Sequence, residues 1–146
     1  MRQWVWMLSL VLLVGCSSKT PPQPLVSVGK VNVPVVLSTH CWTGGCVDFP
    51  APEDHLQVTN YKPVTLHSEP TDSIFVRFNA APPKGFTVTH WPNGRPDHLG
   101  TFNGRDLNIS ASGLVPGVHT FSISAGWKQG SATHIFQLEV RQRGGE

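Results

Sequence analysis

Apolar segments of strand length, separated by turn residues, occupy the chain from Val31 onward. No segment there shows the sustained 3.6-residue apolar period that an amphipathic helix needs. The composition agrees, because 13 prolines and 14 glycines among 146 residues are typical of many short strands joined by turns. The pattern predicts an all-β fold, and seven or eight short strands in one domain predict an immunoglobulin-like antiparallel β-sandwich.

Period-two alternation and turn residues locate the individual strands. Ile74, Val76 and Phe78 alternate with polar positions, which predicts one buried face. The expected strands cover residues 31–39, 55–60, 64–67, 73–79, 86–91, 98–102 and 106–112. Asn103-Gly104 predicts a hairpin between the last two, because both central positions of a type I′ turn need positive φ. Prolines flank Asn93-Gly94, so we expect a projecting loop there.

The C-terminal third predicts a β-hairpin with a defined register. One apolar face comes from each strand, and the two faces are Phe121, Ile123 and Ala125, and Phe136, Leu138 and Val140. Antiparallel pairing puts both sets on the same face only when paired residue numbers sum to an odd value. A sum of 259 pairs Phe121 with Leu138 and leaves residues 128–131 as the loop.

The N-terminus carries an export pattern. Arg2 precedes an apolar segment of about a dozen residues, short of the roughly 20 that cross a bilayer, and the segment ends in small residues beside Cys16. The run Leu13-Val14-Gly15-Cys16 resembles the lipobox of bacterial lipoproteins. The resemblance implies cleavage before Cys16 and lipid on its thiol. We therefore expect a signal peptide at residues 1–15, a lipidated cysteine and flexible tether at 16–30, and the sandwich domain at 31–146.

Lipidation of Cys16 would leave two thiols, Cys41 and Cys46, outside the cytoplasm, where disulfides persist. We expect a structural disulfide between them. Redox or metal-binding roles remain open, although the spacing differs from the Cys-x-x-Cys of such sites. The Cys-Trp…Cys loop, the strand 121–127 and a final strand containing Phe136 resemble small Gram-positive lipoproteins with an immunoglobulin-like domain. That resemblance implies no catalytic residues.

Charge and motifs exclude several function classes. The whole chain has 11 basic and 9 acidic residues, so it lacks the strong field that attracts nucleic acid. It has no Gly-x-Ser-x-Gly elbow, no Ser-x-x-Lys and no glycine-rich phosphate loop. We expect a protein that is not an enzyme and that needs no cofactor. An enzyme whose site is assembled from distant loops stays open as an alternative.

Two tryptophans and an arginine are the best candidates for a binding surface. The six-residue ring closed by Cys41 and Cys46 should limit how deeply Trp42 is buried, and Trp91 precedes the stiff polar loop that carries Arg95. Exposed tryptophan in a stiff loop is enriched at protein interfaces. We expect Trp42, Trp91 and Arg95 to line the contact surface.

Histidines supply the second candidate site. His90 and His98 flank the Asn93-Gly94 loop, and His40 adjoins the disulfide. Two of these three with Asp97 or Asp48 would suit a transition metal, so His40, His90 and His98 are the candidate ligands of a copper or zinc carrier. His119 and His134 should lie too far apart to bind one metal ion. We expect both at the edge of the core. Residues 53–55 combine acid and base types, but we interpret them as a solvated turn.

The sequence thus predicts a lipid-anchored cell-envelope lipoprotein in the cell membrane or outer membrane, with its domain outside the cytoplasm. Its function would be that of a non-catalytic binding module for a protein or an envelope polymer. A metal carrier is the first alternative, and an enzyme with a dispersed site is the second.

Overall fold

The computed structural model describes residues 20–67, 73–79, 81, 83–111 and 113–141. These residues contain eleven strands, a short α-helix and one 3-10 turn. The elements are β1 (Leu25–Val28), β2 (Val31–Val33), β3 (Val36–Trp42), β4 (Gly45–Val47), α1 (Pro52–Val58), β5 (Val64–His67), β6 (Ser73–Arg77), β7 (Gly85–His90), η1 (Pro92–Gly94), β8 (Asp97–Asn103), β9 (Asp106–Ser110), β10 (Gly117–Trp127) and β11 (Gly130–Arg141).

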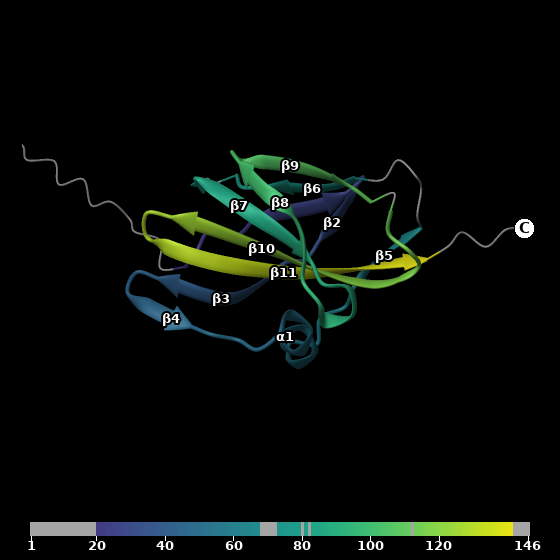
Figure 1. The fold of residues 1–146 in the computed structure, drawn as a ribbon, viewed down its shortest axis with the longest axis horizontal. Helices are drawn as coiled ribbons and strands as arrows, with labels where there is room; N and C mark the ends of the chain where they lie inside the picture. Colours follow the sequence, from purple (N-terminus) through teal and green to yellow (C-terminus); the bar gives the residue numbers. More distant parts are fainter. Residues whose placement is uncertain (1–19, 68–72, 80, 82, 112, 142–146) are drawn as a thin grey trace, which may run out of the picture.

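The strands form two facing sheets (Figure 1). The four-stranded sheet has the order β2-β1-β6-β9, and the seven-stranded sheet has the order β4-β3-β11-β10-β7-β8, with β5 beside the far end of β11. All pairs are antiparallel except β5 with β11. The prediction of a mostly β, sandwich-like fold is confirmed.

The core lies between the sheets, where the predicted alternation holds. Ile74, Val76 and Phe78 are almost completely buried on the four-stranded side. Both predicted faces of the C-terminal hairpin are buried as well. Each fully buried side chain of this kind contributes about 1.5–3 kcal/mol, so period-two patterning is the main determinant of the fold.

The expected strand at 55–60 is wrong, because Pro52–Val58 forms α1. Proline occupies the first helical turn, where its missing N–H costs nothing, and Glu53 and Asp54 beside it complement the helix dipole. Within the helix, the side chains of His55 and Leu56 are buried. The interpretation of residues 53–55 as a solvated turn is therefore also wrong.

The helix α1 packs on the outer face of the seven-stranded sheet, against β3, β10 and β11. Ile135, which alternation places on that outer face, is completely buried. His55 Nδ1 lies 3.0 Å from Ser38 Oγ, and its ring stacks on Phe49 at 3.8 Å between centroids. Because α1 lies on top of the sheet, this face of the sandwich is uneven, whereas the face of a bare sheet would be flatter.

The domain begins earlier than expected. Residues 16–30 were expected to be a flexible tether, but Leu25–Val28 is β1, an inner strand of the four-stranded sheet. Val26 and Val28 alternate inward and are buried, and Pro21 and Pro24 are buried too. The tether prediction is wrong for at least residues 25–28, because four residues of alternating valine are enough to add an inner strand.

The C-terminal hairpin keeps the predicted parity but not the predicted register. Paired residue numbers sum to 257, so Phe121 lies opposite Phe136 and His119 lies opposite Leu138. Trp127 pairs with Gly130, which leaves a two-residue turn at Lys128 and Gln129. Two-residue turns are the commonest hairpin connections, which favours this register over the longer loop expected.

Asn103-Gly104 joins two strands of different sheets. β8 pairs with β7 in the seven-stranded sheet, whereas β9 pairs with β6 in the other sheet. Gly104 has φ of 112°, and Asn103 is not among the residues with positive φ. The expected type I′ hairpin is wrong, since better partners for each strand already lie in separate sheets.

Candidate functional site

Trp42 is buried, with 7% of its surface exposed. Its ring lies edge-on to Trp127 at 5.5 Å between centroids, and Trp127 lies edge-on to Phe78 at 5.6 Å. Neighbouring strand residues point to opposite faces, so an outward Cys41 forces Trp42 inward. The expectation that the disulfide ring keeps this indole exposed is wrong. Trp42 and Trp127 close one end of the core.

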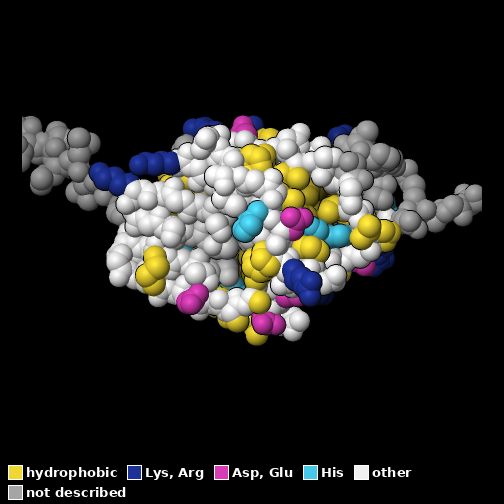
Figure 2. All heavy atoms as spheres, in the orientation of Figure 1, with side chains coloured by type: hydrophobic (Ala, Val, Ile, Leu, Met, Phe, Trp, Pro, Cys, Tyr) yellow, Lys and Arg dark blue, Asp and Glu magenta, His cyan; other side chains and the backbone are white. Residues whose placement is uncertain are grey.

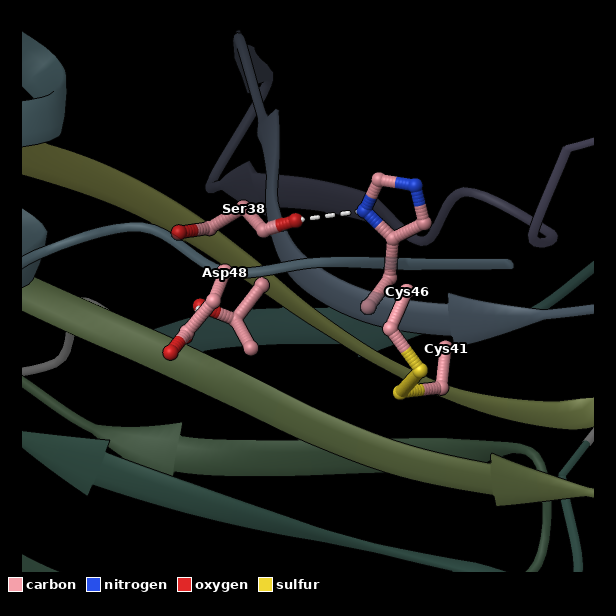
Figure 3. The surroundings of a disulfide bond; sticks show 6 residues. Ser38, Cys41, Cys46 and Asp48 are labelled. Atoms are coloured by element: carbon pink, nitrogen blue, oxygen red, sulfur yellow. Dashed lines mark hydrogen bonds between the residues drawn. A yellow bond between two sulfur atoms is a disulfide. The ribbon is translucent and has the colours of Figure 1, made fainter.

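The predicted disulfide is confirmed: Cys41 and Cys46 lie directly opposite each other on β3 and β4 and are joined (Figure 3). The connection continues past the bridge, because Thr39 Oγ1 donates to Asp48 Oδ1 at 3.1 Å and accepts from the Phe49 N–H at 3.0 Å. The bridge and these side-chain bonds hold the β3–β4 hairpin at the sheet edge.

Replacing both Cys41 and Cys46 by serine should lower the free energy of unfolding by at most about 2 kcal/mol, because the bridge closes a ring of only six residues. The Thr39 hydrogen bonds remain in this variant. Urea denaturation under oxidising conditions measures the difference. A variant that fails to fold would show that the hairpin is more than a local clip.

The second tryptophan anchors the predicted loop. The Trp91 N–H donates to Thr120 O at 2.9 Å, and its Nε1–H donates to Ser122 Oγ at 2.9 Å. Asn93 and Gly94 both have positive φ, and the Arg95 N–H closes the turn on Pro92 O at 3.2 Å. Trp91 is half-buried and Arg95 is exposed. The loop is thus fixed to the outer face of β10 and presents Arg95 to solvent.

Two surface depressions meet beside this loop. The first, of about 280 Å³, is lined by Glu53, Leu56, Gln57, Tyr61, Val118, Thr120 and Gln137. The second, of about 240 Å³, is lined by Pro92, Asn93 and residues 115–119. Val118 belongs to both, and it is 55% exposed, while Val115 is 67% exposed.

We call these residues, together with Arg95, the Val118 surface. Figure 2 shows one face of the molecule, on which hydrophobic side chains lie among charged and histidine side chains.

Polar side chains on the floor of the first depression are held in place. Gln137 Nε2 donates to Thr120 Oγ1 at 3.0 Å, and the Tyr61 hydroxyl donates to Pro34 O at 2.7 Å. Burial raises the pKa of Tyr61, so the phenol stays neutral and serves as a donor. A Cβ added at Gly94 would lie 3.9 Å from Glu53 Oε2. The Trp91 loop and α1 therefore approach each other here.

A histidine pair lies under the second depression. His90 Nε2 and His119 Nδ1 are 3.0 Å apart, and His119 Nε2 lies 2.7 Å from Val115 O. A carbonyl oxygen only accepts, so His119 Nε2 carries the proton that it donates to Val115 O. Burial lowers the pKa of His90, and the neighbouring His119 lowers it further. Both His119 nitrogens are therefore used within the fold.

The structure does not bring His40, His90 and His98 together. His90 lies opposite Asp97 and stacks on Phe121, whereas His98 is paired with Thr89 and points to the other face of the sheet. His40 is near the disulfide, with Nδ1 2.7 Å from Ser38 O (Figure 3). Among the described residues, no group of three or more His, Cys, Asp or Glu side chains is placed to hold a metal ion.

Trp42 and Trp91 also lie apart. Trp91 is bonded to Thr120 and Trp42 contacts Trp127, and these two partners are seven residues apart on β10, about 24 Å. The exposed valines of the Val118 surface were not predicted from the sequence. A usable signal was present, because Val115 and Val118 flank Pro116-Gly117, a turn that presents neighbouring side chains to solvent.

Comparisons of the chain with protein-family models, with curated proteins and with solved structures give no match. Over the part of the chain that the structure describes, no helix has the length and apolar character needed to cross a membrane. Cys16 and the run Leu13-Val14-Gly15-Cys16, on which the lipoprotein prediction depends, lie outside the described residues.

Proposed function

We propose that this chain is a cell-envelope lipoprotein, anchored by lipid on Cys16, whose immunoglobulin-like sandwich is a non-catalytic binding module. The lipobox supports the anchor and the location outside the cytoplasm, and the Cys41–Cys46 bridge agrees with an oxidising compartment. The two facing sheets support the immunoglobulin-like assignment.

The observation that carries the binding role is the Val118 surface. Its centre is apolar and exposed, at Val115 and Val118, and its rim is polar, at Glu53, Gln57 and Arg95. An apolar centre with a polar rim is the usual composition of a protein interface. Hydrogen bonds of Trp91 to β10 hold the loop side of this surface before any partner arrives, which reduces the entropy lost on binding.

A protein partner fits this surface better than an envelope polymer. Sugar rings stack on a free aromatic plane, but Trp91 is half-buried and its Nε1–H is already bonded to Ser122. Trp42 is buried against Trp127, so it is not part of the proposed surface. Trp91 acts as the support of the loop, and Arg95 and Val118 make the contact.

Site-specific photocrosslinking in cells tests the proposal. A photoreactive residue at Val118 should capture a defined protein. Val115→Asp or Arg95→Glu should reduce that capture at least about tenfold, which corresponds to about 1.4 kcal/mol. The first change places an unpaired charge in the apolar centre, and the second reverses the charge of an arginine, a residue type enriched among interface hot spots. The matched control places the photoreactive residue at Asn108, an exposed position on the other sheet. Equal capture at both positions, or capture of glycan alone, would contradict the proposal.

The copper or zinc carrier remains a prediction from the sequence. Metal titration of the purified protein tests it, because a carrier would show saturable binding that is lost when His40, His90 and His98 are replaced. The same holds for an enzyme with a dispersed site, which screening against ester and peptide substrates would detect.

A further inference from the structure

One end of the sandwich gathers positive charge from several separate turns. Arg105, Lys84 and Lys128 are exposed at this end and make no ion pair within the described residues. Hydrogen bonds tie their turns together: Phe78 N–H donates to Arg105 O, and Lys84 N–H donates to Gly126 O. Lys128 lies in the turn that follows Trp127, whose Nε1–H donates to Ala81 O.

The acidic side chain next to Arg105 does not offset its charge, because Asp106 is paired with Arg77, with Nε and Oδ1 3.0 Å apart. Figure 2 shows Lys and Arg side chains at the left end of the view, and others along the top and on the right. We call Lys84, Arg105 and Lys128 the basic end. The net charge of the whole chain is only +2, so this end is distinct from the remaining surface.

The chain enters the domain at the basic end. β1 begins at Leu25, which pairs with Arg77, the last residue of β6 before the turn that carries Lys84. Pro21 is already buried against the domain. Thr20 is the fourth residue after Cys16, so the two lie at most about 14 Å apart even when the chain is fully extended. An anchored Cys16 therefore holds the basic end close to the bilayer, within reach of surface charge that decays over about 10 Å.

We propose that the basic end docks on anionic phospholipid headgroups and fixes the orientation of the domain on the membrane. This inference rests on the proposed lipid anchor. Each lysine or arginine near an anionic surface strengthens the contact about fivefold. β7 runs from the basic end to the Trp91 loop over six residues, about 20 Å. Docking would turn the Val118 surface away from the lipid and toward a partner.

Paramagnetic broadening of backbone amides by a gadolinium-bearing headgroup lipid measures the orientation. The full acylated protein is placed in nanodiscs of phosphatidylcholine, alone or mixed with phosphatidylglycerol. We expect broadening at Gly44, Lys84 and Lys128 with phosphatidylglycerol present, and little at Asn93 and Val118. Added NaCl should reduce it, because screening weakens exposed charges.

Lys84→Gln with Lys128→Gln should weaken the docked state about thirtyfold, whereas the matched pair Lys30→Gln with Lys62→Gln, two exposed lysines away from the basic end, should leave it unchanged. Broadening at both ends alike, or the same pattern in phosphatidylcholine alone, would overturn the docking. Mass spectrometry of the same sample reports the acyl group on Cys16. Its absence would refute the anchor itself, while an acylated protein without orientation would refute only the docking.

Discussion

Gly130→Ala should lower the free energy of unfolding by about 3–5 kcal/mol. A Cβ at Gly130 would lie 2.0 Å from Cys41 O and 3.2 Å from the Trp42 α-carbon. Both are backbone atoms of β3, so no side-chain rotation can relieve the overlap. The φ of 155° adds strain, since L side chains rarely adopt it. β3 would have to move away from the β10–β11 turn and lose the contact of Trp42 with Trp127.

Gly126→Ala in the same hairpin is the matched control. Its Cβ would meet no atom within 4 Å, and its φ is not positive. We expect this variant to keep or slightly raise stability, because alanine restricts the unfolded chain more than glycine. Urea denaturation followed by tryptophan fluorescence compares the two. Equal stability of both variants would refute the close approach of β3 at Gly130.

The faces of the strands were predictable from the sequence, and the register was not. Sums of 257 and 259 both place Phe121 and Phe136 on one face, so alternation cannot choose between them. The observed register brings Gly130 opposite Trp42, where only glycine fits. That contact joins β11 to a strand some 90 residues earlier, and no local pattern contains it.

Elements with few buried side chains escaped prediction for a related reason. Among its seven residues α1 buries only His55 and Leu56, too few to reveal a helical period. The prediction of a turn at Asn103-Gly104 is correct. The partners of the two strands that it joins, however, are β7 and β6, which lie in different sheets. Likewise, the loop of Trp91 was predictable, whereas the depression beside it depends on where α1 packs.

Histidine in the core was only partly anticipated. His134 was expected at the core edge, but it is 1% exposed, opposite Ile123 on β10 and Leu37 on β3. Neither ring nitrogen has a hydrogen-bond partner among the described residues. Burial, with a smaller contribution from the charge of His40, lowers the pKa of His134 to about 4 from the ordinary 6.5. The folded protein therefore holds this imidazole neutral.

Stability should fall as the pH drops from about 6.5 to about 4. Above pH 6.5 the ring is neutral in both states, so its contribution is constant. Below 6.5 the unfolded chain binds a proton that the folded protein refuses until about pH 4, and unfolding is favoured by up to about 1.4 kcal/mol per pH unit. The total loss is about 3 kcal/mol. Burial also lowers the pKa of His55 and of His90, which adds to the same trend.

Two variants of similar volume separate titration from packing. His134→Leu and His134→Gln should both reduce the pH slope by about one proton, because neither side chain titrates. At pH 7 the leucine variant should be about 1–2 kcal/mol more stable, since it removes an unpaired polar group, and the glutamine variant less stable, since it keeps one. Urea denaturation across this pH range measures both effects. An unchanged slope in both variants would show that His134 already carries its proton, or a partner, in the folded protein.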